Sequence, residues 1–343
     1  MRYSLPIRRA GMTLVELLVV ITILGLLAVT VLPALATSAE SRRTRETTRM
    51  VSSFIAKAQG RAIGRQEWSG LKLAAVNASS VAAIDLFLAD VPEAYRGDTT
   101  SASLTISGTP SSTMATAVPV SASDIFSIAT LGIQAGDPIR FDGRGTPYEI
   151  SSASSSSVVF KLRGNSAVAK EDVGQSAHNT PWPALNVSHP FEIYRQPQPS
   201  GLPLTLAGGR AIDLYWSGFG PPQSNGIAGT YQQFSTLGGA GSSLSILFDS
   251  VGRLRQVVIG AYRYTVTGPV YLLIGRADRA GQGYGTLNTN DDSLGANWQY
   301  PDSYWIAIDP ITGLVRTAEC KPNSASVLDS QAWIRQALLA GGT

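Results

Sequence analysis

An uncharged apolar run near the N-terminus restricts this chain most. From Leu17 to Ala39 there are 23 residues without a charged side chain, and most of them are Leu, Val, Ile or Ala. A helix rises about 1.5 Å per residue, so this run can cross a hydrocarbon core of roughly 30 Å. One alternative is a buried helix of a soluble domain. The other is a secretory signal peptide, because Ala34–Ala36 could mimic the small-residue cleavage site of such a peptide. The length favours a membrane-spanning helix over residues 17–39.

A single acid precedes this run. Glu16 stands between Val15 and Leu17, and a carboxylate in hydrocarbon costs about 2.5–3.5 kcal/mol even on the lenient insertion scale. Such a residue needs a partner. Arg8 and Arg9 lie beyond Gly11, whereas cleavage after Gly11 would create an α-amino group on the next residue. The sequence therefore favours a new N-terminus as the partner of Glu16.

The residues around this acid resemble a known processing segment. The run Arg8-Arg9-Ala10-Gly11-Met12-Thr13-Leu14-Val15-Glu16 followed by an apolar helix is similar to the prepilin cleavage and methylation segment of type IV pilins and type II secretion pseudopilins. The resemblance implies cleavage between Gly11 and Met12 by a prepilin peptidase and N-methylation of Met12. It also implies that Glu16 neutralises the Met12 amine of a neighbouring subunit in a filament. Pro33 stands where these proteins often carry a helix-kinking proline.

The helix is expected to continue beyond the apolar run. Apolar residues recur at i, i+3, i+4 and i+7, which is the pattern of one buried helix face; they are Met50, Val51, Phe54, Ile55, Ala58, Ala62 and Ile63. We predict a helix from Leu14 to Arg65, weakened at Pro33 because proline lacks a backbone donor. Its first half is apolar all round and suits a membrane, and its second half suits packing on a globular head.

After residue 70 the pattern changes to short apolar runs between Gly, Pro, Ser and Asn clusters, which is typical of antiparallel sheets. The predicted strands are 71–76, 104–107, 138–141, 148–151, 158–162, 191–194, 211–216, 244–248, 254–260, 262–266, 270–275, 305–308 and 314–318, with 81–88 open between strand and helix. Asp142-Gly143 and Asp309–Gly313 are turn signals, and residues 327–339 are expected to form a short helix. The fold class is therefore α+β: a long N-terminal helix packed on an antiparallel β head.

The C-terminal half resembles the end of H-class minor pseudopilins and related transformation minor pilins. The resemblance rests on Phe248-Asp249-Ser250-Val251-Gly252-Arg253 and on Ile308-Asp309-Pro310-Ile311-Thr312-Gly313-Leu314-Val315-Arg316. The heads of this family are commonly shorter, so residues 91–203 are interpreted as a β insertion. The expected organisation is a leader over 1–11, a helix over 12–65 and a head over 66–343.

Charge, cysteine content and missing motifs argue against several classes of function. The leader holds three of the 27 basic residues and no acid, so its removal leaves 27 − 3 = 24 basic against 24 acidic residues. A balanced head argues against general nucleic-acid binding. One cysteine cannot form an intramolecular disulfide, and no G-x-S-x-G or phosphate loop is present. We therefore expect no enzyme activity and no cofactor.

Two weaker hypotheses concern ligands. Asp291 and Asp292 lie in an oxygen-rich loop that could hold Ca²⁺, although the spacing does not match an EF-hand. Arg253 and Arg255 lie in a Gly-Arg-Leu-Arg turn, and transformation minor pilins use such arginines on DNA. Phosphate contacts need several cations, so an exposed β-turn is the simpler interpretation.

The sequence analysis ends on a structural role. We expect a minor pseudopilin that is anchored in the bacterial inner membrane, with its head in the periplasm, and assembles into a type II secretion pseudopilus. Its partners would be other pilin-type subunits, prepilin peptidase, membrane lipid and secreted proteins. The alternatives are a minor pilin of a type IV pilus acting in adhesion or DNA uptake, and an enzyme anchored by a pilin-like helix.

Overall fold

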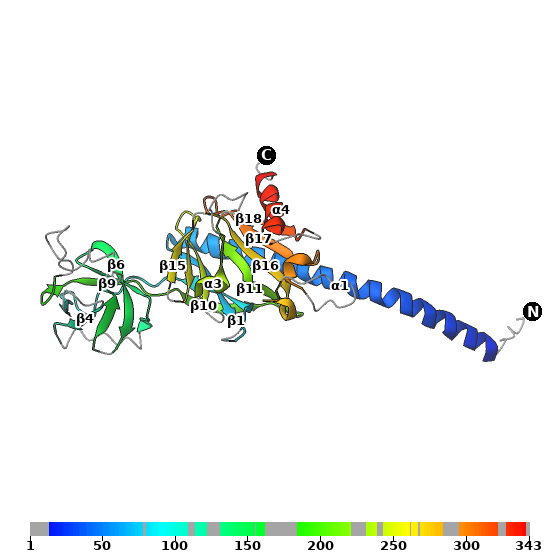
Figure 1. Ribbon diagram of the computed structural model, residues 1–343, viewed down its shortest axis with the longest axis horizontal. Helices are drawn as coiled ribbons and strands as arrows, with labels where there is room; N and C mark the ends of the chain where they lie inside the picture. The colour runs from blue at the N-terminus through cyan, green and yellow to red at the C-terminus, as the bar shows by residue number, and fades with distance from the viewer. Residues whose placement is uncertain are drawn as a thin grey trace, which may run out of the picture.

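A long helix and two β units make up the described chain. The computed structural model describes residues 14–77, 80–108, 114–121, 131–154, 156–161, 184–220, 231–238, 243–260, 262–266, 268–283, 295–321 and 327–340; of residues 28–39, 146, 328 and 337–340 it describes the backbone alone. Helix α1 (Leu14–Arg65) enters a β head, and a second β unit lies beyond the head, at the end opposite the N-terminus (Figure 1). The predicted α+β class is confirmed as a long N-terminal helix with antiparallel β-sheets.

Helix α1 has the bounds that the sequence predicts. It runs for 52 residues, which at about 1.5 Å per residue is about 78 Å. The helix continues through Pro33, whose side chain lies outside the described residues. Helix α1 can therefore connect the N-terminal segment to the head as one rod.

The larger sheet surrounds the second half of α1. It has 11 antiparallel strands in the order β15-β14-β13-β1-β2-β11-β16-β17-β18, while β10 pairs with β2 and β12 pairs with β11. The strands are β1 (Ser69–Ala75), β2 (Ala82–Asp90), β10 (Gln198–Thr205), β11 (Arg210–Phe219), β12 (Gln232–Gln233), β13 (Leu244–Phe248), β14 (Leu254–Ile259), β15 (Tyr262–Thr265), β16 (Val270–Arg276), β17 (Tyr304–Ile308) and β18 (Val315–Glu319). The helices α3 (Phe234–Gly238) and α4 (Val327–Ala340) and the 3-10 turns η2 (Ala277–Arg279) and η3 (Asn297–Gln299) complete this unit, which we call the head.

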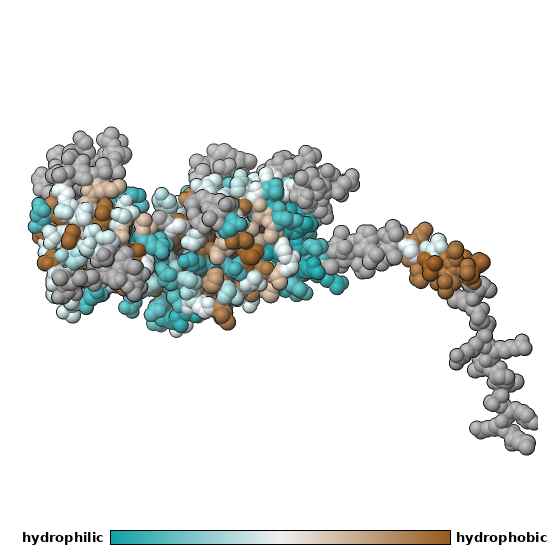
Figure 2. Space-filling view, turned by 90° about the horizontal axis from the view of Figure 1, so that it is seen from below, coloured by the Kyte–Doolittle hydropathy of each residue, from teal (hydrophilic) through white to brown (hydrophobic). Residues whose placement is uncertain are grey.

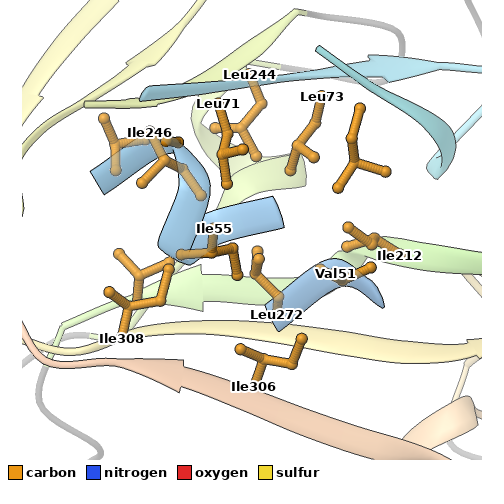
Figure 3. Close-up of a cluster of buried hydrophobic side chains, with 14 of the residues drawn as sticks. Val51, Ile55, Leu71, Leu73, Ile212, Leu244, Ile246, Leu272, Ile306 and Ile308 are labelled. Carbon is orange, nitrogen blue, oxygen red and sulfur yellow. The ribbon is translucent and has the colours of Figure 1, made fainter. Parts of the chain in front are cut away.

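The core of the head forms on α1 itself. Val51, Ile55, Ala58 and Ala62 are fully buried. Figure 3 shows Leu71 and Ile246 on one side of the helix and Ile306 on the other, so the curved sheet supplies apolar side chains from two directions. The predicted apolar stripe is correct for these four helix residues.

Two other members of the predicted stripe are not buried. Met50 is 40% exposed and Ile63 is 48% exposed. The sheet curves around one face of the helix and covers the i, i+4, i+7 and i+11 positions beginning at Val51. Met50 and Ile63 lie at the borders of that face, so the prediction of burial was wrong for both.

The second β unit is a closed barrel built from residues within 91–203. Its strands follow the order β8-β3-β4-β7-β6-β5-β9. β8 and β9 are separated by Pro190 alone, and β8 pairs with β3 while β9 pairs with β5. Residues 188–193 therefore close the sheet on itself, which removes free edges. The strands are β3 (Leu104–Ser107), β4 (Met114–Pro119), β5 (Pro138–Phe141), β6 (Arg144–Ala153), β7 (Val158–Lys161), β8 (Ser188–His189) and β9 (Phe191–Ile193).

The barrel has its own core and its own turn chemistry. Its core includes Ile106, Phe141 and Phe160. The predicted turn at Asp142-Gly143 joins β5 to β6, with φ of 50° and 62°, and two positive φ values characterise the tight turns that match strand twist. A separate core on a closed sheet gives the barrel the features of an independently stable unit.

Candidate assembly interface

The N-terminal part of α1 presents apolar side chains outward. Every described side chain from Leu14 to Leu27 is exposed, and Figure 2 shows this segment as an apolar stretch beyond the head. Glu16 lies in the first turn of this helix and is exposed with its neighbours. A carboxylate in a first helical turn is favoured by the helix dipole. The segment thus combines a long apolar surface with one acid at its start.

The residues of the predicted cleavage site are not part of this geometry. Gly11 and Met12 lie outside the described residues. Among the residues that the structure does describe, no helix is long and apolar enough to span a membrane. Cleavage after Gly11, the pairing of Glu16 and a span over 17–39 all stay predictions.

Helix α1 enters the head through a polar collar. Thr44, Thr47 and Thr48 are buried, and the hydroxyl of each donates to the carbonyl four residues earlier. These bonds satisfy the hydroxyls inside the helix, so threonine can be buried there without an external partner. The collar lets α1 pass from exposed helix to apolar core.

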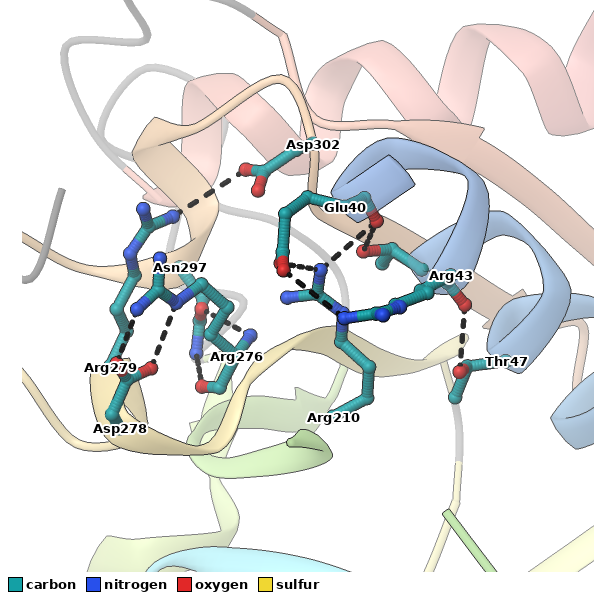
Figure 4. A network of polar contacts seen from close by, with 10 residues as sticks. Glu40, Arg43, Thr47, Arg210, Arg276, Asp278, Arg279, Asn297 and Asp302 are labelled. Carbon is teal, nitrogen blue, oxygen red and sulfur yellow. Dashed lines mark hydrogen bonds and ion pairs between the residues drawn. The ribbon is translucent and has the colours of Figure 1, made fainter. Parts of the chain in front are cut away.

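An arginine from the sheet fixes the helix at the collar. Arg210, at the start of β11, is 1% exposed and pairs with the Glu40 carboxylate (Figure 4). Its guanidinium also donates to the Glu40 carbonyl at 3.0 Å. Arg45 of α1 donates to the Tyr304 hydroxyl of β17 at 3.2 Å and to the Glu319 carboxylate of β18 at 3.2 Å. These contacts set the position of α1 along its own axis relative to the sheet.

A second set of contacts holds the other end of α1. Arg61 and Arg65 both pair with Asp90, and the Ser69 hydroxyl donates to the same carboxylate at 3.4 Å. Burial alone would raise the pKa of Asp90, but the hydrogen bonds from Arg61 and Ser200 and the two positive charges bring it below its ordinary value. Helix α1 is therefore tied to the sheet at both ends of its packed half.

A buried acid joins the elements beside the collar. Asp213 is fully buried, and its carboxylate accepts hydrogen bonds from Tyr215 N, Gly281 N and Asn297 Nδ2 at 3.0–3.3 Å. Burial raises its pKa to about 6. Asn297 also accepts from the Arg276 backbone at 3.0 Å, which connects β16 to η3 (Figure 4). Asp213 and Asn297 thus connect β11, β16 and the loop after η2.

The barrel meets the head at another buried acid. Asp137, before β5, is fully buried and lies 3.5 Å from the Arg263 guanidinium of β15. The same guanidinium donates to the carbonyls of Tyr194 at 2.9 Å and Arg195 at 3.0 Å. Burial raises the pKa of Asp137 to about 6 despite this pairing. One arginine of the head thus holds three groups of the barrel and its linker.

The candidate DNA-contacting arginines lie in the β13–β14 turn. Arg255 donates to the Asp249 carboxylate at 2.9 Å, and that carboxylate also accepts the backbone N–H of Val251 and Arg253. Arg253 is exposed. Arg255 therefore has a carboxylate partner within the turn, whereas the described residues supply no ion pair for Arg253.

The candidate calcium residues Asp291 and Asp292 lie outside the described residues. Within the described residues, no three His, Cys, Asp or Glu side chains gather closely enough to hold a metal ion. His189 is buried, with Nδ1 2.9 Å from Asp142 and Nε2 2.9 Å from the Ala184 carbonyl. It connects the closing strand of the barrel to the β5–β6 turn.

Sequence reasoning missed the residues that position α1 and the barrel on the head. Glu40 and Arg210 are 170 positions apart, and Asp137 and Arg263 come from different β units. Local patterns carry no signal for such pairs. The one local hint is in β11, where Arg210 and Asp213 stand in an otherwise apolar run up to Trp216.

Comparison with known proteins identifies the N-terminal segment. Residues 7–32 match the family model of the prokaryotic N-terminal methylation motif, a range that contains Gly11, Met12 and Glu16. No curated protein and no solved structure matches the chain. The motif precedes and overlaps the exposed apolar part of α1. The chain therefore carries a prokaryotic N-terminal methylation motif, which indicates a pilin- or pseudopilin-type protein and implies processing by a prepilin peptidase and assembly with other pilins.

Proposed function

We propose that this chain is a minor pseudopilin of a type II secretion system. It would be anchored in the inner membrane by residues 17–39, present its head in the periplasm and act by assembly rather than by catalysis. The observation that carries the proposal is the methylation motif at 7–32 running directly into a helix whose second half is the core of the head. A subunit built this way transmits a displacement of its membrane segment to its head.

The geometry of α1 supports a role in a filament core. Its apolar side chains from Leu14 to Leu27 are exposed, so they offer a surface to helices of other subunits once the helix leaves the lipid. Glu16 would then lie in an apolar environment, where an unpaired charge is costly. A methylated Met12 amine from a neighbouring subunit is the partner that we propose for it.

The position of the barrel supports a place at the tip. In Figure 1 the barrel lies beyond the C-terminal end of α1, along the direction in which the helix points. Subunits of a helical filament stack along that direction, so a barrel there occupies the space of the next subunit. Such a head fits best where no further subunit follows, which favours a minor subunit over a repeating one.

A minor pilin of a type IV pilus is the alternative role. The methylation motif is common to both systems and does not separate them. The turn at Arg253 and Arg255 offers little support for DNA uptake, because Arg255 already pairs with Asp249. The phenotype of a deletion strain distinguishes the two roles: loss of an exported enzyme from the medium supports the pseudopilus, and loss of DNA uptake or adhesion with normal export supports the pilus.

The assembly role is tested by Glu16→Leu. The substitution leaves Gly11 and the apolar helix intact and lowers the cost of insertion, so cleavage and membrane insertion should be unchanged. Crosslinking to the major filament subunit should fall several-fold at equal levels of cleaved protein. Glu46→Leu is the matched control, since Glu46 is an exposed acid of the same helix outside the apolar run. Equal crosslinking of Glu16→Leu and wild type would show that Glu16 does not support assembly.

A further inference from the structure

A shallow groove runs along the outer face of α1 within the head. Its volume is about 420 Å³. Five of its lining residues come from two consecutive turns of α1 and one comes from the edge strand β10; they are Arg49, Met50, Ser53, Phe54, Lys57 and Leu204. This face of α1 borders the side chains that enter the core, and Phe54 and Leu204 also pack against that core. The ion pairs that tie α1 to the sheet do not use these lining residues.

The groove has an apolar floor with a cation at each end. Met50 is 40% exposed, and Phe54 and Leu204 are half-buried beside it. Arg49 and Lys57 are exposed and eight residues apart on the helix, which places their Cα atoms about 12 Å apart along its axis. Methionine adapts its shape to different apolar partners. The arrangement fits an apolar side-chain cluster flanked by negative charge on both sides.

The two cations have no carboxylate partner in the described chain. Other arginines of α1 do: Arg43 pairs with Glu40, Arg45 with Glu319, and Arg61 and Arg65 with Asp90. For Arg49 and Lys57, the described residues supply no ion pair, and Lys57 lies over the Phe54 ring at 5.9 Å. No acid lines the groove. The positive charge at its ends is therefore available to a partner.

The edge of strand β10 beside the groove disfavours binding of a partner as an added β-strand. β10 carries Pro199 and Pro203, which have no backbone N–H, and its register with β2 shifts between Ser200 and Leu204. Prolines and bulges on an edge strand block the addition of another strand. A partner of this groove must therefore bind through side chains, as an amphipathic helix does in an apolar groove.

We propose that the groove binds an amphipathic helix of a different protein, one that presents apolar side chains between two carboxylates seven or eight residues apart. A second copy of this chain does not fit. The acids of its described α-helices are Glu16, Glu40, Glu46 and Asp329, and no two of them have that spacing. The inference goes beyond the proposed filament role and does not depend on it, because the groove lies wholly within the head.

The test uses the full chain in detergent and a labelled helical peptide with two leucines between glutamates seven residues apart. Fluorescence anisotropy should show binding that weakens about tenfold for Arg49→Glu/Lys57→Glu, as expected for two exposed ion pairs turned into repulsions. The matched control is Arg42→Glu/Arg144→Glu, which makes the same change in net charge at exposed positions away from the groove. It should bind like wild type.

A charge swap makes the test specific. A peptide with lysines in place of the glutamates should bind the Arg49→Glu/Lys57→Glu variant better than wild type. A peptide whose glutamates lie on opposite helix faces should bind wild type weakly. Equal affinity of both double variants for the glutamate peptide would overturn the proposal. Binding of wild type to anionic phosphatidylglycerol vesicles but not to the peptide would also overturn it and identify a lipid surface instead.

Discussion

Truncation of Ile55 to alanine should strongly destabilise the head. Ile55 is 0% exposed and lies between the two sides of the curved sheet (Figure 3). Replacing a buried isoleucine by alanine costs about 2–5 kcal/mol, because the removed methyl groups lose their transfer free energy and leave a cavity. Side chains approach Ile55 from both sides, so the cavity cannot close easily, and we expect about 3–4 kcal/mol.

The expected shift can be measured by thermal unfolding of the full chain in detergent. For a unit of about 200 residues, 1 kcal/mol lowers Tm by about 2–4 °C, so a loss of about 3–4 kcal/mol in Ile55→Ala should lower the head transition by roughly 6–16 °C. Tryptophan fluorescence follows the head, because Trp298 and Trp305 are buried there. The barrel has a separate core, so any barrel transition should stay in place.

Ile63→Ala is the matched control. It makes the same chemical change eight residues later on the same helix, at a side chain that is 48% exposed. Its cost should be less than half that of Ile55→Ala. Equal shifts for the two variants, or no shift for Ile55→Ala, would refute the view that the head folds around the second half of α1.

Three further predictions concern the buried acids and two glycines. Because the pKa of Asp213 is raised by burial from 3.8 to about 6, the folded head binds a proton more tightly than the unfolded chain. The free energy of unfolding of the head should therefore rise as pH falls from about 6 to about 4, and the raised pKa of Asp137 should act in the same direction on the barrel. Urea titrations at several pH values will show this slope; Asp213→Asn should flatten it and lower stability, because the new amide would face the Asn297 amide donor. A pH-independent wild type would contradict the effect. Gly70→Ala should destabilise the head by more than about 2 kcal/mol, since a Cβ there would lie 1.9 Å from the Ile246 carbonyl oxygen. Gly60→Ala, in open space on α1, should instead stabilise by about 0.5–1 kcal/mol, and a loss of stability in its thermal melt would argue against the helix.

Local patterns predicted most individual elements. The bounds of α1 follow from its unbroken apolar run and the stripe after it, and strands β3, β5 and β13 have the predicted limits. The uncertain run 81–88 is strand β2. Four strands were missed for identifiable reasons. β8 and β12 have only two residues each, too few for an alternating pattern. β4 is a weak alternation of small residues, and β10 contains prolines that usually argue against a strand.

Long-range pairing was beyond local patterns. The order of strands in the head, the closure of the barrel by 188–193 and the contact between Glu40 and Arg210 join residues far apart in the chain. The groove beside α1 could not be predicted from local patterns either. Met50 belongs to the apolar stripe by spacing, but whether it faces the core or a groove depends on how far the sheet curves around the helix.

The mature N-terminus tests the central claim most directly. Protein extracted from the membranes of its native host should be analysed by intact mass and N-terminal sequencing. A processed pilin-type subunit should begin at N-methylated Met12, with residues 1–11 removed and one added methyl group in the mass. A chain that begins at Met1, or after Ala36, would contradict the pilin-type assignment and the filament role built on it.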